Sequence, residues 1–259
     1  MKRCMLFVAA LLAAAPSAFG QSSAGSDAQQ TLARASAENK YTFLLFYRTN
    51  NGPTQAMAQT LKSGLAGRAA TAVYVNANSP AEQPLLQRYG VARAPMPLVV
   101  AVAPNGAVTG LFASKVSQQQ IAGAFVTPTM EKCMKSMQQG RLVMVCVKTS
   151  PGADVPQGVR DFRADPHFAK RTEVLSLVAD DPTEADFLDQ LKIDSRTLRG
   201  TTTAFLAPPA VLVGKFGENA TKDEMAAALS AAGKCCDDPN CKHNHKGHQA
   251  SQPTRSTRN

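Results

Sequence analysis

The chain has 259 residues, of which 44% are hydrophobic and 18% are charged, a composition that indicates a globular protein with room for two modest domains. The formal net charge is +9, but the basic residues are spread along the chain without a dense run. Trp is absent and there are only 4 Tyr, so the sequence offers no aromatic platform for bases. We therefore expect no nucleic acid as a partner.

The N-terminus has the three parts of an export signal. Lys2 and Arg3 give a positive start, residues 5–15 are apolar, and residues 18–20 form a small-residue cleavage site. We expect residues 1–20 to be a signal peptide, the mature chain to begin at Gln21, and the protein to be periplasmic or secreted. The apolar part is too short for a stable anchor, and no later segment is long and apolar enough to span a bilayer, so we expect no integral membrane segment.

The first predicted strand, residues 41–47, is a continuous apolar and aromatic run, which is typical of a strand buried on both faces of a parallel sheet. A helix is expected from about residue 52, because Pro53 suits a first helical turn, where its missing N–H costs nothing. Two further strands are expected over residues 98–102 and 107–112, joined by a turn at Pro104-Asn105-Gly106.

Together these pieces resemble a thioredoxin domain over about residues 26–126. Residues 50–55 lie over the family's Trp-Cys-Gly-Pro-Cys-Lys motif, and Pro95 lies over the cis-proline that faces the active site. An X-Pro bond holds the cis form at modest cost, and Pro97 is close enough to compete for that role. The resemblance implies an α/β thioredoxin-like fold with a groove between these two segments.

The predicted groove lacks the chemistry of the family. Asn51 and Thr54 stand where the family has its two cysteines, and Leu45 stands where it has a buried acid. Thiol exchange needs a thiolate nucleophile and a second thiol to resolve the mixed disulfide, so dithiol oxidoreductase activity is not expected at this position. The residues predicted to line the degenerate site are Asn51, Gly52, Pro53, Thr54 and Pro95.

An internal repeat extends the resemblance to the second half of the chain. Residues 103–125 align with residues 207–229 at a constant offset, and capping boxes at Ser117 and Thr221 start a helix in each copy. We therefore expect two tandem thioredoxin-like domains, at 21–126 and 127–233. In the second copy we expect helices over 128–138, 155–165, 182–192 and 221–232, and strands over 141–148, 173–178, 202–206 and 210–215. The counterpart of the cysteine motif is expected at 150–153, and that of the cis-proline at Arg199 or Gly200.

Two cysteines belong to the second domain. Cys133 is predicted on its first helix and Cys146 on the strand that follows, so the two can approach one another across the contact between helix and sheet. Two interpretations remain open: a disulfide between Cys133 and Cys146, and a role for Cys146 as a small core residue between Val145 and Val147.

Residues 234–259 form a polar tail that contains three cysteines and three histidines. Cysteine and histidine together match zinc or copper, although the spacing fits no standard zinc module. The alternatives are a disulfide from Cys235 or Cys236 to Cys241 with a disordered extension after it, and a catalytic dithiol. The candidate metal or disulfide residues are Cys235, Cys236, Cys241, His243, His245 and His248.

Two functions follow from these features. The first is an exported, non-catalytic binding or scaffold protein that holds extended peptides or exported proteins, because in the family the backbone beside the cis-proline pairs with a substrate as an added strand. The second is a thiol-redox or metal-handling protein that acts through the tail, with the folded domains as a scaffold.

Overall fold

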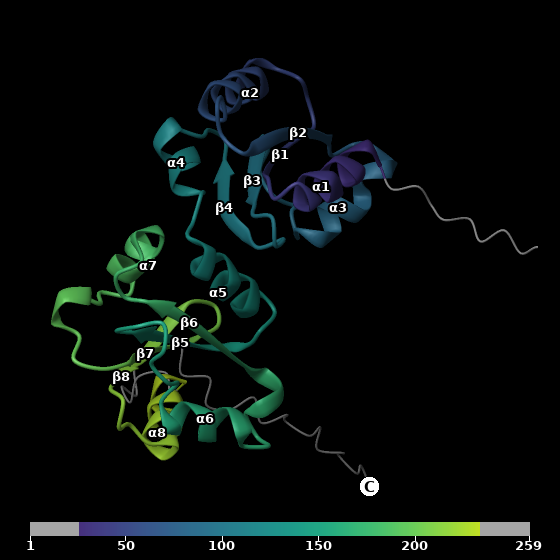
Figure 1. Ribbon diagram of the computed structural model, residues 1–259. Helices are drawn as coiled ribbons and strands as arrows, with labels where there is room; N and C mark the ends of the chain where they lie inside the picture. The colour runs from purple at the N-terminus through teal and green to yellow at the C-terminus, as the bar shows by residue number, and fades with distance from the viewer. Residues whose placement is uncertain (1–25, 234–259) are drawn as a thin grey trace, which may run out of the picture.

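The computed structural model describes residues 26–233, which form two four-stranded mixed sheets with helices packed around each of them (Figure 1). The elements of the first unit are α1 (Asp27–Ala37), β1 (Tyr41–Tyr47), α2 (Gly52–Gly64), β2 (Ala70–Asn76), the 3-10 helix η1 (Pro80–Glu82), α3 (Gln83–Arg88), β3 (Leu98–Val102), β4 (Val108–Ala113) and α4 (Gln118–Gly123).

The second unit repeats this order. Its elements are α5 (Pro128–Gln138), β5 (Leu142–Lys148), α6 (Gln157–Ala164), η2 (Ala169–Arg171), β6 (Thr172–Val178), η3 (Pro182–Glu184), α7 (Ala185–Gln190), η4 (Ser195–Thr197), β7 (Thr202–Ala207), β8 (Val211–Phe216) and α8 (Lys222–Ala232). The sheet orders are β2-β1-β3-β4 and β6-β5-β7-β8, so the two units share one topology. This confirms the expected α/β fold with two tandem thioredoxin-like copies.

Strand β1 is buried on both faces, as its apolar run predicts. Phe43 and Leu45 point into one core cluster, while Leu44 and Phe46 point into the other, because successive strand side chains alternate between faces. The sheet is mixed, however, since β1 runs parallel to β2 and antiparallel to β3. The expectation of a parallel sheet was therefore right for only one neighbour of β1.

The structure corrects two alignments inside the second unit. Helix α6 begins at Gln157 with Pro156 as its N-cap, so residues 150–153 form a turn and a loop before the helix and do not occupy its first turn. Strand β7 begins at Thr202, so the residue that corresponds to Pro97, directly before β3, is Thr201 and not Arg199 or Gly200. Both errors arise because the loops of the two units differ in length.

Helix α5 lies between the two sheets and contacts both units (Figure 1). The amide of Gln138 pairs with both backbone groups of Val108 at the start of β4, at 2.9 Å from the N–H and 2.7 Å from the carbonyl oxygen. The Tyr41 hydroxyl donates a 2.5 Å hydrogen bond to Glu131 Oε1. On the side of the second unit, the Thr129 N–H donates to the buried Glu184 carboxylate at 2.8 Å. The first and second units are therefore joined by specific polar contacts of one helix.

Glu131 makes this junction sensitive to pH. Burial raises the pKa of its carboxyl above the ordinary 4.5, and the hydrogen bond from Tyr41 opposes part of that shift. Because the folded protein holds this proton more tightly than the unfolded chain, the contribution of Glu131 to stability is lost as the pH rises through the folded-state pKa. We expect Glu131→Gln, which keeps an acceptor for Tyr41, to gain stability over the wild type as the pH rises above 4.5.

Urea denaturation of both proteins at a series of pH values measures this difference. The exposed Glu218→Gln is the matched control, because it removes the same charge outside the junction. Parallel pH profiles for wild type and Glu131→Gln would contradict the assignment.

Candidate functional site

The predicted groove residues Asn51 to Thr54 lie where the end of β1 leads into α2. Asn51 is the N-cap of α2, and its Oδ1 accepts hydrogen bonds from the Thr54 N–H at 3.2 Å and from the Thr54 hydroxyl at 3.1 Å. The Thr54 hydroxyl also contacts the Thr49 carbonyl oxygen at 2.8 Å, and Thr54 is only 5% exposed. The side chains of Asn51 and Thr54 therefore contact one another, and Asn51 caps the helix.

Pro95 does not hold the cis bond that the family pattern assigned to it. In the part of the chain that the structure describes, the cis bonds are Met96–Pro97 and Pro208–Pro209. Phe46 pairs with Leu98, which places the buried Pro97 next to the end of β1, whereas Pro95 is exposed and lies two residues further out in the loop. The Ala-Pro-Met-Pro segment offers two candidates, and only the strand register separates them.

Arg48 fixes the loop before β3 to the segment before α2. Its guanidinium donates to the Ala92 carbonyl oxygen at 2.8 Å and to the Ala94 carbonyl oxygen at 3.5 Å, and its own carbonyl oxygen accepts from the Asn78 side chain at 2.8 Å. The sequence reasoning missed this residue. The signal for it was its place as the first charged side chain after the buried strand β1.

The backbone N–H and carbonyl groups of Met96 also lie at this site. Within residues 26–233, neither its N–H nor its carbonyl group has a hydrogen-bond partner. The next carbonyl, that of Pro97, already accepts from the Ser114 N–H at 2.8 Å. Met96 therefore presents one donor and one acceptor beyond the end of β3, at the same end of the sheet as the start of α2.

Cys133 and Cys146 are free thiols, so the disulfide considered between them is not formed. Cys133 packs in a cluster with Val145 and Val147, whereas Cys146 packs in the cluster on the opposite face of the sheet. A residue between two inward-facing valines must face the other way, and this alternation separates the thiols. Burial raises the pKa of Cys133 to about 12 and also raises the pKa of Cys146, so both stay protonated near neutral pH.

The candidate tail residues Cys235, Cys236, Cys241, His243, His245 and His248 lie outside the described residues, as does the predicted signal peptide. Between residues 26 and 233, no group of three or more His, Cys, Asp or Glu side chains is arranged to hold a metal ion. None of the helices in that range is long and apolar enough to cross a membrane.

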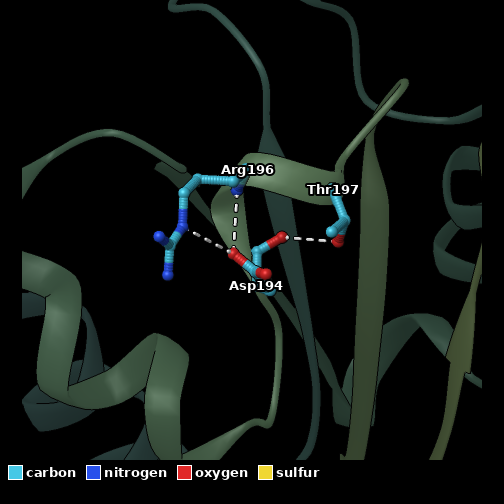
Figure 2. A network of polar contacts seen from close by, with 3 residues as sticks. All are labelled: Asp194, Arg196 and Thr197. Carbon is cyan, nitrogen blue, oxygen red and sulfur yellow. Dashed lines mark hydrogen bonds and ion pairs between the residues drawn. The ribbon is translucent and has the colours of Figure 1, made fainter.

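A hollow of about 470 Å³ in the second unit is lined by four aspartates, Asp180, Asp181, Asp189 and Asp194, together with Lys192 and Arg196. Figure 2 shows that Asp194 is held by its own loop: its carboxylate accepts from the Arg196 N–H at 3.0 Å and its carbonyl oxygen from the Thr197 hydroxyl at 3.0 Å. Asp181 accepts in the same way from Thr183, which holds the pKa of Asp181 below its usual range. These two carboxylates therefore serve as helix caps.

The fold defines a protein of two thioredoxin-like units, the first of which has Asn51 and Thr54 at the start of its helix α2. No protein-family model matches this chain, and no curated protein sequence matches it. Solved structures that are similar to it contain thioredoxin-like domains. They include human ERp44 in its zinc-bound form, with 10% identity and a TM-score of 0.34, over 80% of this chain and 60% of that one.

Two more of these structures come from microorganisms. A thioredoxin mutant from Halobacterium salinarum NRC-1 has 17% identity and a TM-score of 0.30, over 42% of this chain and 83% of that one. The NTD_N/C domain of the alkylhydroperoxide reductase AhpF from Enterococcus faecalis has 15% identity and a TM-score of 0.28, over 77% of this chain and 97% of that one.

Proposed function

We propose that the protein is an exported, non-catalytic thioredoxin-like module that binds extended peptides, or extended segments of exported proteins, between Met96 and the start of α2. The observation that supports this proposal is the unpartnered backbone of Met96. An extended chain that pairs with it gains two main-chain hydrogen bonds, and β-strand addition of this kind needs no thiol. We expect the protein to show only a weak preference among peptide sequences, because these hydrogen bonds are made to the peptide backbone.

The surroundings of Met96 fit an extended ligand. Gly52 is exposed, and a Cβ added there would have no atom within 4 Å, so the start of α2 leaves space beside the loop. Arg93 is exposed on the same loop and adds a positive charge. The N-terminal end of α2 carries a partial positive charge as well, so acidic side chains beside the paired segment are favoured.

The export part of the proposal rests on the charged start, the apolar core and the small-residue site in residues 1–20. This part of the proposal is tested by measuring the intact mass of the protein purified from the cells that express it. A mature chain that begins at Gln21 supports export, and a chain that still carries residues 1–20 would contradict it.

A bulky side chain at the start of α2 is expected to block the groove. Gly52→Trp places an indole in open space at the start of α2, at the end of the sheet where Met96 lies, so we expect the fold to be kept and an extended ligand there to be obstructed. We expect binding to an array of overlapping short peptides to fall by about tenfold or more, since an extended segment then loses its main-chain hydrogen bonds, each worth about 1 kcal/mol.

Gly152→Trp is the matched control. Gly152 also has no atom within 4 Å of an added Cβ and lies in the loop before α6 of the second unit. Equal peptide binding by the two Trp variants and the wild type would rule out the groove at Met96. Loss of binding in both variants would point to a site other than this one.

A further inference from the structure

Helix α5 carries a stripe of sulfur atoms, of which only Met134 packs against the core of the first unit. Met130, Cys133, Met134 and Met137 are spaced three and four residues apart, which places them along one side of the helix. The polar contacts to the first unit come from other positions, Glu131 and Gln138.

All four of these residues line one pocket of about 280 Å³. The pocket lies between α5, α7 and the β7–β8 turn, and its other walls include Phe187, Leu191 and Leu212. Cys133 is only 1% exposed, and Met130 and Met137 pack against the cluster to which it belongs. Met134 reaches the same pocket while packing against the core of the first unit.

The chemistry of this lining is selective. Thioether and thiol sulfurs are soft ligands, and soft ligands select Cu(I) over harder divalent ions. The residues around the pocket include no His, Asp or Glu, so the imidazole and carboxylate donors that zinc, magnesium and calcium favour are missing from it, and its side-chain oxygens are those of the Gln138 and Gln190 amides. Apolar side chains, among them Phe187, Leu191 and Leu212, form most of the other walls, and such surroundings favour a soft, weakly hydrated cation.

We propose that this pocket binds one Cu(I) ion, through the thiolate of Cys133 and the thioethers of Met130, Met137 and Met134. Binding replaces the proton on Cys133 Sγ with the metal: one S–H bond breaks, one Cu–S bond forms, and the proton leaves to solvent. No electron is transferred, because the ion enters and stays as Cu(I). The site lies in the second unit and is independent of the peptide groove at Met96.

The test uses the full chain with its tail ligands removed, since the tail carries soft ligands of its own. In this background the three tail cysteines are changed to Ser and the three tail histidines to Asn. Cu(I) is supplied without oxygen as its bicinchoninate complex, and the fraction that the protein withdraws is measured. We expect one Cu(I) per chain, with sulfur as the only element in the first coordination sphere by X-ray absorption.

Replacing the three methionines with Leu removes the thioethers and keeps their volume. We expect Met130→Leu, Met134→Leu and Met137→Leu together to weaken Cu(I) binding by at least about tenfold. The matched control is Met57→Leu, Met144→Leu and Met225→Leu, three buried methionines outside the pocket. The proposal is overturned if the background protein withdraws no Cu(I), or if the pocket triple variant binds it as tightly as the control triple variant. If the three methionines only fill the core, one of these two results is expected.

Discussion

Asn51→Cys together with Thr54→Cys is expected to give the first unit thiol–disulfide exchange activity. The two side chains already contact one another at 3.1 Å, at the first turn of α2. A helix N-terminus lowers the pKa of a thiol from about 8.5 to roughly 3.5–7.5, which raises its thiolate fraction at pH 7 by about tenfold. With tail cysteines changed to Ser, and with dithiothreitol supplied as the reductant that returns the variant's disulfide to the dithiol, we expect the double variant to reduce insulin disulfides about tenfold faster than the same background without it.

The single variant Asn51→Cys is the control for this gain. It has the activated thiol but no second thiol of its own to resolve the mixed disulfide, so we expect it to show a smaller gain than the double variant under the same conditions. A double variant that forms no internal disulfide, or that reacts no faster than the background, would show that the start of α2 does not hold two thiols in a geometry that supports exchange.

Gly158→Ala is expected to destabilise the second unit by about 2 kcal/mol. A Cβ at Gly158 would overlap the carbonyl oxygen of Ala220, where α6 packs against the start of α8. The overlap is with backbone, so no rotamer change relieves it, and overpacking of this kind costs about 3 kcal/mol. The better helix propensity of Ala returns at most about 1 kcal/mol.

Denaturation in urea measures this loss as a fall in the midpoint. Gly152→Ala is the control, because an added Cβ there meets nothing within 4 Å, and we expect its free energy of unfolding to change by less than about 0.5 kcal/mol. If Gly158→Ala were as stable as Gly152→Ala, the contact of α6 with the α8 start would not be as tight as the structure describes.

The part of the fold that was predicted depends on interactions between near neighbours in the chain. Both capping boxes are present, with Ser117 and Thr221 as N-caps, because each needs only a hydroxyl and a Gln or Glu three residues later. The start of α5 at Pro128 and the burial of β1 were also predicted, the latter from its unbroken apolar run. Helical and strand periodicity carry such information within a single segment.

The alternatives that only the structure could decide depend on residues far apart in the sequence. The disulfide considered between Cys133 and Cys146 was excluded by the face of the sheet on which each thiol lies. The choice of Pro95 over Pro97 was wrong, because the register of β3 against β1 decides which proline meets the end of the strand. Spacing within one segment does not contain that register.

The sequence by itself determined the two copies of the fold and the cap of helix α2 by Asn51, because these follow from residue type and local pattern. Only the tertiary structure decided that the backbone of Met96 is free and that one face of α5 brings its sulfur atoms into a common pocket. Whether a backbone group has a hydrogen-bond partner depends on where the neighbouring strands and loops lie. Whether side chains share a pocket depends on the elements that surround them. Both depend on how distant segments pack together.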